Sequence, residues 1–271
     1  MAVLLSAAAA AQFPALNSIQ PRGAQRGTEV EVTLKGNKLG DARALLFDPG
    51  GIEVRKLKQK KDGKLVAQLA IAPDAPLGLR AVWVQTATGL SDLATFSVGA
   101  LPELEEAEPN GSAEEAQAIP LDCTVNGVAE DEDVDYYAFE GRAGERVSVE
   151  IEGMRLGDEL FDPAVALLDA AGFALASCDD SALARQDPAL SARLPRNGRY
   201  YVRVRESAYR GNKNYYYRVH VGRFPRPLTT LPLGGRPGES LAPLWLGADH
   251  VQEGTPVTLP AEGETLSLIH I

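Results

Sequence analysis

The sequence predicts an all-β protein built from consecutive β-sandwich domains. Several segments alternate apolar and polar residues with a period of two, which is typical of half-buried strands. Turn-forming residues separate these segments, and the 271 residues include 26 glycines and 18 prolines. The predicted strands are short and follow one another at close intervals, a spacing typical of sandwiches.

The first group of predicted strands lies between residues 16 and 98. Residues 28–34 alternate cleanly, with Val30, Val32 and Leu34 on the face that we expect to be buried. With the further strands, about seven short strands are expected here, as in an immunoglobulin-like sandwich. The other strands are expected at residues 44–47, 52–59, 65–71, 81–85 and 94–98.

A β-hairpin is expected around Asp62-Gly63, which lies between two runs of residues that can pair. We expect its lysines to be solvated and to protect the sheet edge against aggregation. A ligand-binding patch is the alternative interpretation. The lysines concerned are Lys56, Lys58, Lys60, Lys61 and Lys64.

Two motifs give this first region a family resemblance. They are SIQPRGAQRGTEVEVTLKGNKLGD at residues 18–41 and APLGLRAVWVQTATGLSDLATFSV at residues 75–98. With them, residues 17–98 resemble an IPT/TIG-type immunoglobulin-like domain. In secreted bacterial proteins such domains are spacers or binding modules, so the resemblance implies a role without catalysis.

A second group of predicted strands follows an acidic linker at residues 101–107. Residues 145–151 alternate, with Val147, Val149 and Ile151 expected to point inward. Residues 164–168 form a continuous apolar run. The remaining strands are expected at residues 125–128, 136–139, 173–177, 199–205 and 215–221.

Five motifs in this second region occur in a characteristic order. They are EPN at 108–110, DVDYYAF at 133–139, FDPAVALLDAAGFALASCDD at 161–180, LPRNGRYYVRVRES at 194–207 and YRVHVGRFPRP at 217–227. With them, residues 106 to 224 resemble the bacterial pre-peptidase C-terminal (PPC) domain. The resemblance implies a small jelly-roll-like β-sandwich that accompanies secreted peptidases. The related collagen-binding domains of bacterial collagenases bind calcium.

The resemblance also implies a calcium site, because oxygen ligands lie on both sides of the strand at residues 125–128. Calcium takes six to eight oxygen ligands, mostly from carboxylates and carbonyls. One departure weakens the match: Gly111 stands where the calcium-binding relatives have an acid. The candidate ligands are Glu106, Glu108, Asn110, Asp131 or Glu132, and Asp135.

Two other interpretations of these acids stand beside calcium. Asp131, Asp133 and Asp135 have the spacing of the first three EF-hand ligands, but Tyr136 and Arg142 occupy the positions that need glycine and glutamate. The simpler alternative is a solvated acidic loop in which Asp135 caps a turn.

A second candidate site is a face of arginines and aromatic residues. On residues 199–205 and 215–221 every second side chain is basic or aromatic, and we expect these residues to point outward. If the two strands pair, they form one platform suited to an extracellular protein or polysaccharide. An ordinary exposed sheet is the alternative. The platform residues are Arg199, Tyr201, Arg203, Arg205, Tyr216, Arg218 and His220.

The ends of the chain carry separate expectations. Residues 1–11 are similar to the end of a secretory signal peptide. Residues 232–241 align with residues 21–30, so residues 226–265 are expected to begin a further immunoglobulin-like module that is truncated. Residues 266–271, LSLIHI, have the appearance of sequencing-adapter read-through. The expected domains are therefore residues 12–102, immunoglobulin-like, and 103–225, PPC-like.

Composition and motifs exclude several classes of function. The formal net charge of -10 argues against nucleic acid as a partner, and no segment approaches the ~20 apolar residues of a membrane span. The two cysteines, Cys123 and Cys178, form either one disulfide or two free buried thiols. We find no HExxH, GxSxG or glycine-rich phosphate loop, so no catalytic residues are expected.

We therefore expect a non-catalytic exported protein, located in the periplasm, at the cell surface or outside the cell. Its β-sandwich array would serve binding, spacing or substrate targeting. The alternative is the accessory region of a secreted hydrolase or peptidase whose catalytic domain lies outside this sequence.

Overall fold

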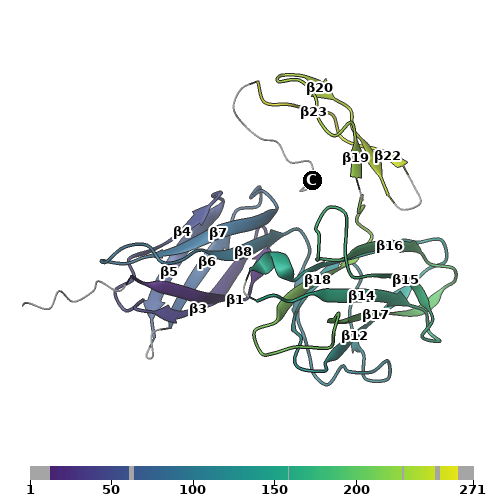
Figure 1. The fold of residues 1–271 in the computed structure, drawn as a ribbon, viewed down its shortest axis with the longest axis horizontal. Helices are drawn as coiled ribbons and strands as arrows, with labels where there is room; N and C mark the ends of the chain where they lie inside the picture. Colours follow the sequence, from purple (N-terminus) through teal and green to yellow (C-terminus); the bar gives the residue numbers. More distant parts are fainter. Residues whose placement is uncertain (1–12, 61–63, 158, 228, 248–250, 262–271) are drawn as a thin grey trace, which may run out of the picture. The chain divides into compact units, whose positions relative to one another are not determined.

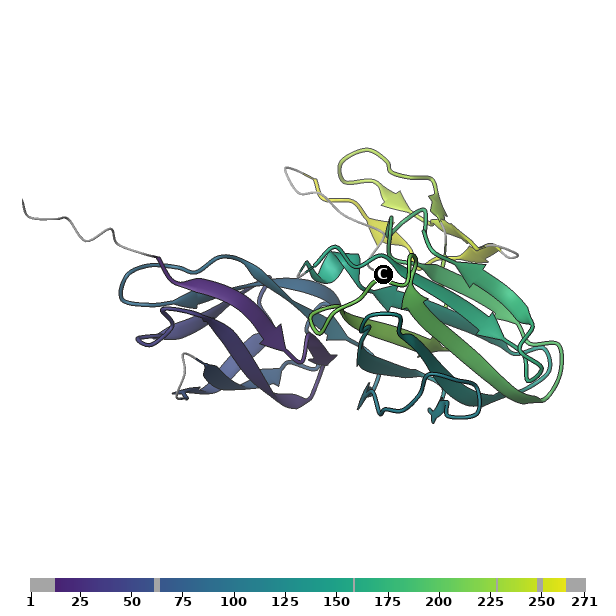
Figure 2. The same cartoon turned by 60° about the horizontal axis from the view of Figure 1, so that its bottom comes forward.

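The structure is a computed structural model that describes residues 13–60, 64–157, 159–227, 229–247 and 251–261. The chain divides into two compact units, Met1–Val98 and Gly99–Ile271. Strands and connecting loops make up nearly all of both units (Figures 1 and 2). Within the described residues the helical element is the 3-10 turn η2 (Met154–Leu156). The prediction of an all-β fold is confirmed.

The first unit is a two-sheet sandwich. One sheet has the order β1-β3-β6-β5 and the other has the order β2-β8-β7-β4. These orders correspond to the ABED and GFC sheets of an immunoglobulin-type sandwich. The strands are β1 (Ala15–Gln20), β2 (Gly23–Gln25), β3 (Glu29–Asn37), β4 (Ala44–Asp48), β5 (Ile52–Gln59), β6 (Leu65–Ile71), β7 (Gly78–Gln85) and β8 (Ala94–Gly99).

One apolar core fills the first unit and draws on both sheets. Val32 and Leu34 of β3 are fully buried, as their alternation predicts, and they share this core with Val84 of β7 and Phe96 of β8. Strand β5 lies at a sheet edge. Its lysines are exposed, which fits a solvated, charged edge that resists pairing with other chains.

The second unit is a jelly roll. Its sheets have the orders β10-β12-β17-β14-β15 and β16-β13-β18-β11-β9. From β11 to β18 the chain alternates between the sheets except at the β14–β15 hairpin, as in a jelly roll. The strands are β9 (Glu103–Glu105), β10 (Gln117–Ala118), β11 (Cys123–Val128), β12 (Val134–Gly141), β13 (Arg146–Glu152), β14 (Pro163–Leu168), β15 (Ala174–Cys178), β16 (Ala189–Arg193), β17 (Gly198–Glu206) and β18 (Tyr216–Gly222).

The core of the second unit contains aromatic residues from both sheets. Tyr137 and Phe139 of β12 pack in one cluster with Tyr217 of β18, and all three are buried. Both cysteines are free thiols, which settles the alternative left by the sequence. Cys123 lies buried on β11, whereas Cys178 on β15 is partly exposed because it belongs to the edge strand of the opposite sheet.

Three strands of the second unit have no counterpart among the predicted elements. β9 forms within the segment interpreted as an acidic linker, because its backbone pairs in parallel with β11. β10 and β16 are too short or too polar at their ends for periodicity to reveal them. β9 matters most, because it fixes the chain immediately before the candidate site.

The C-terminal residues form two small sheets, β19-β21-β22 and β20-β23. Their strands are β19 (Thr229–Leu231), β20 (Ser240–Leu241), β21 (Leu244–Leu246), β22 (Val251–Glu253) and β23 (Val257–Thr258). The predicted signal peptide and the predicted read-through segment lie outside the described residues. No helix in the described ranges is long and apolar enough to cross a membrane.

Candidate metal centre

Residues 106–110, here called the EPN segment, are held at both ends by main-chain hydrogen bonds. At one end the Glu106 amide donates to the Asn126 carbonyl, 2.9 Å away, immediately after β9. At the other end the Tyr136 amide of β12 donates to the Asn110 carbonyl, also at 2.9 Å. The segment therefore crosses from one sheet of the jelly roll to the other.

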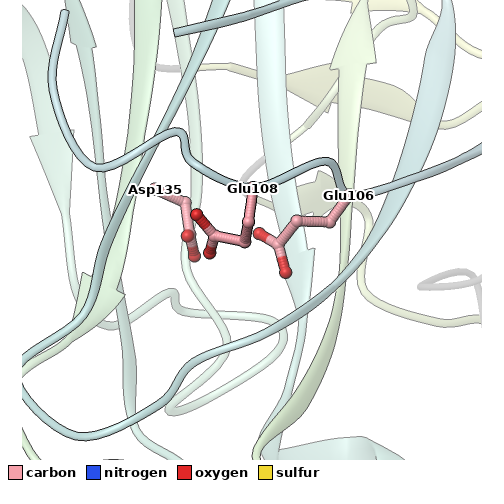
Figure 3. A group of neighbouring side chains, drawn as sticks. All are labelled: Glu106, Glu108 and Asp135. Carbon is pink, nitrogen blue, oxygen red and sulfur yellow. The ribbon is translucent and has the colours of Figure 1, made fainter. Parts of the chain in front are cut away.

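The EPN segment brings two glutamates to an aspartate of β12. Glu106, Glu108 and Asp135 each offer a carboxylate oxygen, and these oxygens lie within 4.8 Å of one another. Figure 3 shows the three carboxylates gathered in one place. Like charges so close repel one another unless protons or a cation neutralise them.

Two core tyrosines hold the Glu106 carboxylate. The Tyr137 hydroxyl donates to Oε1 of Glu106 at 2.7 Å, and the Tyr217 hydroxyl lies 2.9 Å from the same atom. Oε2 accepts from the Val128 amide at 2.9 Å. Glu106 is thereby fixed at the boundary between the core and solvent.

Asp135 is the most deeply buried acid of the cluster, with 0% of its surface exposed. Its Oδ2 lies 2.6 Å from the Tyr217 hydroxyl. Burial, followed by the charge of Glu106, raises the pKa of Asp135 to about 9. A proton on Asp135 also relieves a shortage of donors, because the two tyrosine hydroxyls make four contacts with each other and with the carboxylates but carry only two protons.

Two buried oxygens of the site have no hydrogen-bond partner among the described residues: Oδ1 of Asp135 and Oδ1 of Asn110. Asn110 is fully buried. Its side-chain amide nitrogen donates to Glu106 at 3.2 Å, whereas its side-chain oxygen is the atom without a partner among the described residues. Unpaired buried oxygens are costly and call for an explanation. A hard cation would supply one, since the donors present are all oxygens.

The donor set fits calcium better than a transition metal. Glu106, Glu108, Asn110 and Asp135 offer carboxylate and amide oxygens, with no nitrogen or sulfur among them. Glu108 accepts a hydrogen bond from the backbone amide of Asn110 at 2.9 Å. Because Glu108 is exposed, the site is open on one side to water. Water could complete the six to eight ligands that calcium takes.

Two predicted ligands do not join this cluster. Asp131 and Glu132 are exposed on the turn before β12, and the Glu132 amide donates to the Tyr209 carbonyl. Burial raises the pKa of Glu108 most, and the negative charges of two other acids of this turn, Asp133 and Glu130, raise it further. Spacing along the sequence does not give the direction of a side chain in a turn, so it could not separate Asp131 and Glu132 from the acids that lie together.

The predicted platform of arginines and tyrosines does not exist as one surface. β17 pairs with β12 and β14, whereas β18 pairs with β11 and β13, so the two strands lie in different sheets. This corrects the expectation that Arg199, Tyr201, Arg203 and Arg205 share a face with Tyr216, Arg218 and His220. The cause is the topology, because strands that follow one another in a jelly roll mostly lie in opposite sheets.

Arg218 is a buried structural residue and is unsuited to binding a ligand. Its side chain is 0% exposed and forms ion pairs with Glu103 of β9 and Glu152 of β13. Its Nε donates to the Asn126 side chain at 3.2 Å. His220 accompanies it, with Nδ1 2.8 Å from the Thr124 hydroxyl.

Replacement of Gly127 should disturb the acidic cluster through Tyr217. A Cβ at this position would lie 2.3 Å from Cζ of Tyr217, closer than two such atoms can approach. We therefore expect Gly127→Ala to displace the Tyr217 hydroxyl and to cost about 1–3 kcal/mol through overpacking. Chemical denaturation checks the loss. Gly111→Ala is the control, because its Cβ would meet nothing nearer than 3.8 Å, and an equal loss in both variants would contradict the interpretation.

These features define the second unit as a β-sandwich module with a cluster of acids at its edge. Residues 133–206 match the sequence model of the bacterial pre-peptidase C-terminal domain. This part of the chain therefore belongs to the PPC family. The match includes Asp135, Tyr136 and Tyr137 on β12, but the EPN segment lies outside it.

Three solved structures illustrate the likeness. The pre-peptidase C-terminal domain of a collagenase from Bacillus anthracis is 18% identical, with a TM-score of 0.33, over 43% of this chain and 99% of that one. The Aeromonas hydrophila periplasmic inhibitor of g-type lysozyme, PliG, is 18% identical with a TM-score of 0.31, over 40% and 96%.

The third is the Bacteroides ovatus protein SGBP-B in complex with a mixed-linkage heptasaccharide. It is 10% identical with a TM-score of 0.27, over 73% of this chain and 72% of that one. No curated protein matches the sequence significantly.

Proposed function

We propose that this chain is a non-catalytic binding and spacing region of an exported protein, and that calcium organises its PPC domain. The observation that carries the proposal is the cluster of Glu106, Glu108 and Asp135 beside two unpartnered buried oxygens. Its partners would be extracellular proteins or polysaccharides.

The proposed metal has a mechanical role. The EPN segment contributes Glu106, Glu108 and Asn110, whereas Asp135 belongs to β12. A cation bound by both would lock the segment onto the sandwich and neutralise the repulsion among the three carboxylates. Because such a cation binds the folded state alone, it would stabilise the domain by mass action.

Terbium luminescence tests the site directly. Terbium takes oxygen ligands as calcium does, and Tyr137 and Tyr217 lie in contact with Glu106, so excitation of tyrosine should sensitise bound terbium. We expect a luminescence signal that calcium displaces. Glu108→Gln should remove the signal without unfolding the domain, because Glu108 is exposed.

Asp131→Asn is the matched control for this experiment. It removes the same charge from a nearby exposed acid that lies outside the cluster. Its terbium signal should equal that of the wild type. Equal loss in Glu108→Gln and Asp131→Asn would mean that terbium senses only the general acidity of the surface, and the absence of any displaceable signal in the wild type would refute the calcium site.

A further inference from the structure

The outer face of the sheet β12-β17-β14-β15 carries a row of residues with unlike sizes. Register pairs Arg203 of β17 with Tyr136 on one side and with Ala166 on the other, and Ala166 pairs with Ser177 of the edge strand β15. In the adjacent row Arg205 pairs with Ala164. These four strands run side by side in Figure 1.

The small residues of β14 create a groove between longer neighbours. The groove has a volume of about 230 Å³. Ala164 and Ala166 form its floor, the two arginines of β17 form one wall, and Ser177 with Asp179 forms the other. This volume is below the ~300 Å³ of the smallest drug-sized sites, so the groove suits one ring-sized group at a time.

The two arginines differ in how they are held. Arg205 donates to the carbonyls of Glu206 and Ser207 and stacks over the ring of Tyr209, 4.5 Å from its centre. Its guanidinium is therefore fixed in place. Arg203 is partly buried and makes no hydrogen bond or ion pair with any residue in the described ranges. A guanidinium with free donors at the wall of a groove matches the planar, two-oxygen geometry of a carboxylate.

The charges that line the groove narrow the choice of ligand. The two arginines outnumber Asp179, so the groove favours a group that carries a single negative charge. Asp179 on the far wall would repel a second carboxylate but accepts hydrogen bonds from hydroxyl groups, as the Ser177 hydroxyl does. One carboxylate beside several hydroxyls is the pattern of a uronic acid residue, whereas an acidic peptide brings several carboxylates and few hydroxyls.

We propose that this groove binds a carboxylate-bearing sugar residue of an acidic polysaccharide, with Arg203 and Arg205 on the carboxylate and Ser177 and Asp179 on the hydroxyls. The proposal deepens the binding role proposed above and does not depend on the metal. It assigns the β17 half of the predicted platform to a site and leaves the β18 half to structure.

Titration of the full chain with a short oligogalacturonate tests the proposal, with NMR shifts and calorimetry as readouts. The wild type should bind it, and the amides that shift should lie on β14, β15 and β17. A neutral maltooligosaccharide of equal length should not bind. Arg203→Gln should raise the dissociation constant by about tenfold or more, which is the loss of affinity expected when a charge-assisted hydrogen-bond pair is removed.

Arg142→Gln is the control, because it removes the same charge from an exposed arginine in the loop after β12, away from the groove. It should bind as the wild type does. Three results would overturn the proposal. They are an equal loss of affinity in Arg203→Gln and Arg142→Gln, no binding of the oligogalacturonate by the wild type, and NMR shifts at amides outside β14, β15 and β17. Tighter binding of an acidic glutamate peptide than of the oligogalacturonate would overturn the choice of a sugar. Each of these failures leaves the terbium result unaffected.

Discussion

Arg218→Met should cost about 3–5 kcal/mol of unfolding free energy, the loss expected when one partner of a buried ion pair is removed. The variant would leave the carboxylates of Glu103 and Glu152 in a low-dielectric setting without their shared cation. Chemical denaturation of the full chain measures the loss. Arg203→Met on β17 is the control. It should change stability by less than about 0.5 kcal/mol, because Arg203 makes no ion pair with any described residue.

The same network predicts a specific sensitivity to acid. Burial alone would raise the pKa of Glu152, but Arg218, His220 and Arg155 together outweigh burial and hold this pKa well below its usual range. A depressed folded-state pKa contributes stability that is present above the unfolded pKa near 4.3 and is lost as the pH falls through the lower, folded value. We therefore expect the stability gap between wild type and Arg218→Met to shrink below about pH 4. A gap that stays constant from pH 7 to pH 3 would show that Glu152 does not depend on Arg218.

The contrast between Arg203 and Arg218 shows how far the sequence can predict a surface. Alternation correctly separates both arginines from the buried faces of their strands, where Val202, Val204, Val219 and Val221 are fully buried. The alternation cannot predict which residues of the adjacent strands lie beside each arginine. β9 and β13 supply acids beside Arg218, whereas β14 supplies alanines beside Arg203. Partner strands far away in the sequence therefore decide whether an outward arginine is buried or available.

The acidic cluster also combines residues that the sequence can predict with residues that it cannot. The acids of the EPN segment and Asp135 can be proposed as ligands because the family resemblance supplies the pairing. The tyrosines cannot, since Tyr217 meets Asp135 across 82 residues and belongs to the opposite sheet. A buried tyrosine in an alternating strand gives the same sequence pattern whether its hydroxyl lies against a carboxylate or against a backbone carbonyl.

Asp135→Asn should have opposite effects on the metal-free and the calcium-loaded protein. In a chelator at neutral pH we expect the variant to be more stable than the wild type by about 1–3 kcal/mol, the usual cost of a poorly paired buried polar group. An amide has the shape of the protonated carboxyl, and its oxygen can accept from the Tyr217 hydroxyl in the same way. The substitution also removes the repulsion between the carboxylates of Asp135 and Glu106.

The advantage of the variant should depend on pH with a definite sign. Because the folded-state pKa of Asp135 is raised to about 9, its contribution to stability is fully present below the unfolded pKa near 3.9 and is lost as the pH rises towards the folded value. The asparagine does not titrate. In chelator, the free energy of unfolding of the wild type should therefore decrease relative to that of the variant as the pH rises from 5 to 8. Thermal unfolding at several pH values measures this difference.

Calcium should reverse the comparison, because the wild type alone retains the buried carboxylate that the cation needs. At a calcium concentration 100 times the dissociation constant, the wild type should gain about 2.7 kcal/mol and the variant nothing. Asp131→Asn should follow the wild type in both conditions. If Asp135→Asn is destabilised in chelator and still gains stability with calcium, then Asp135 is an ordinary buried turn residue and the cation, where one binds, is held by other groups.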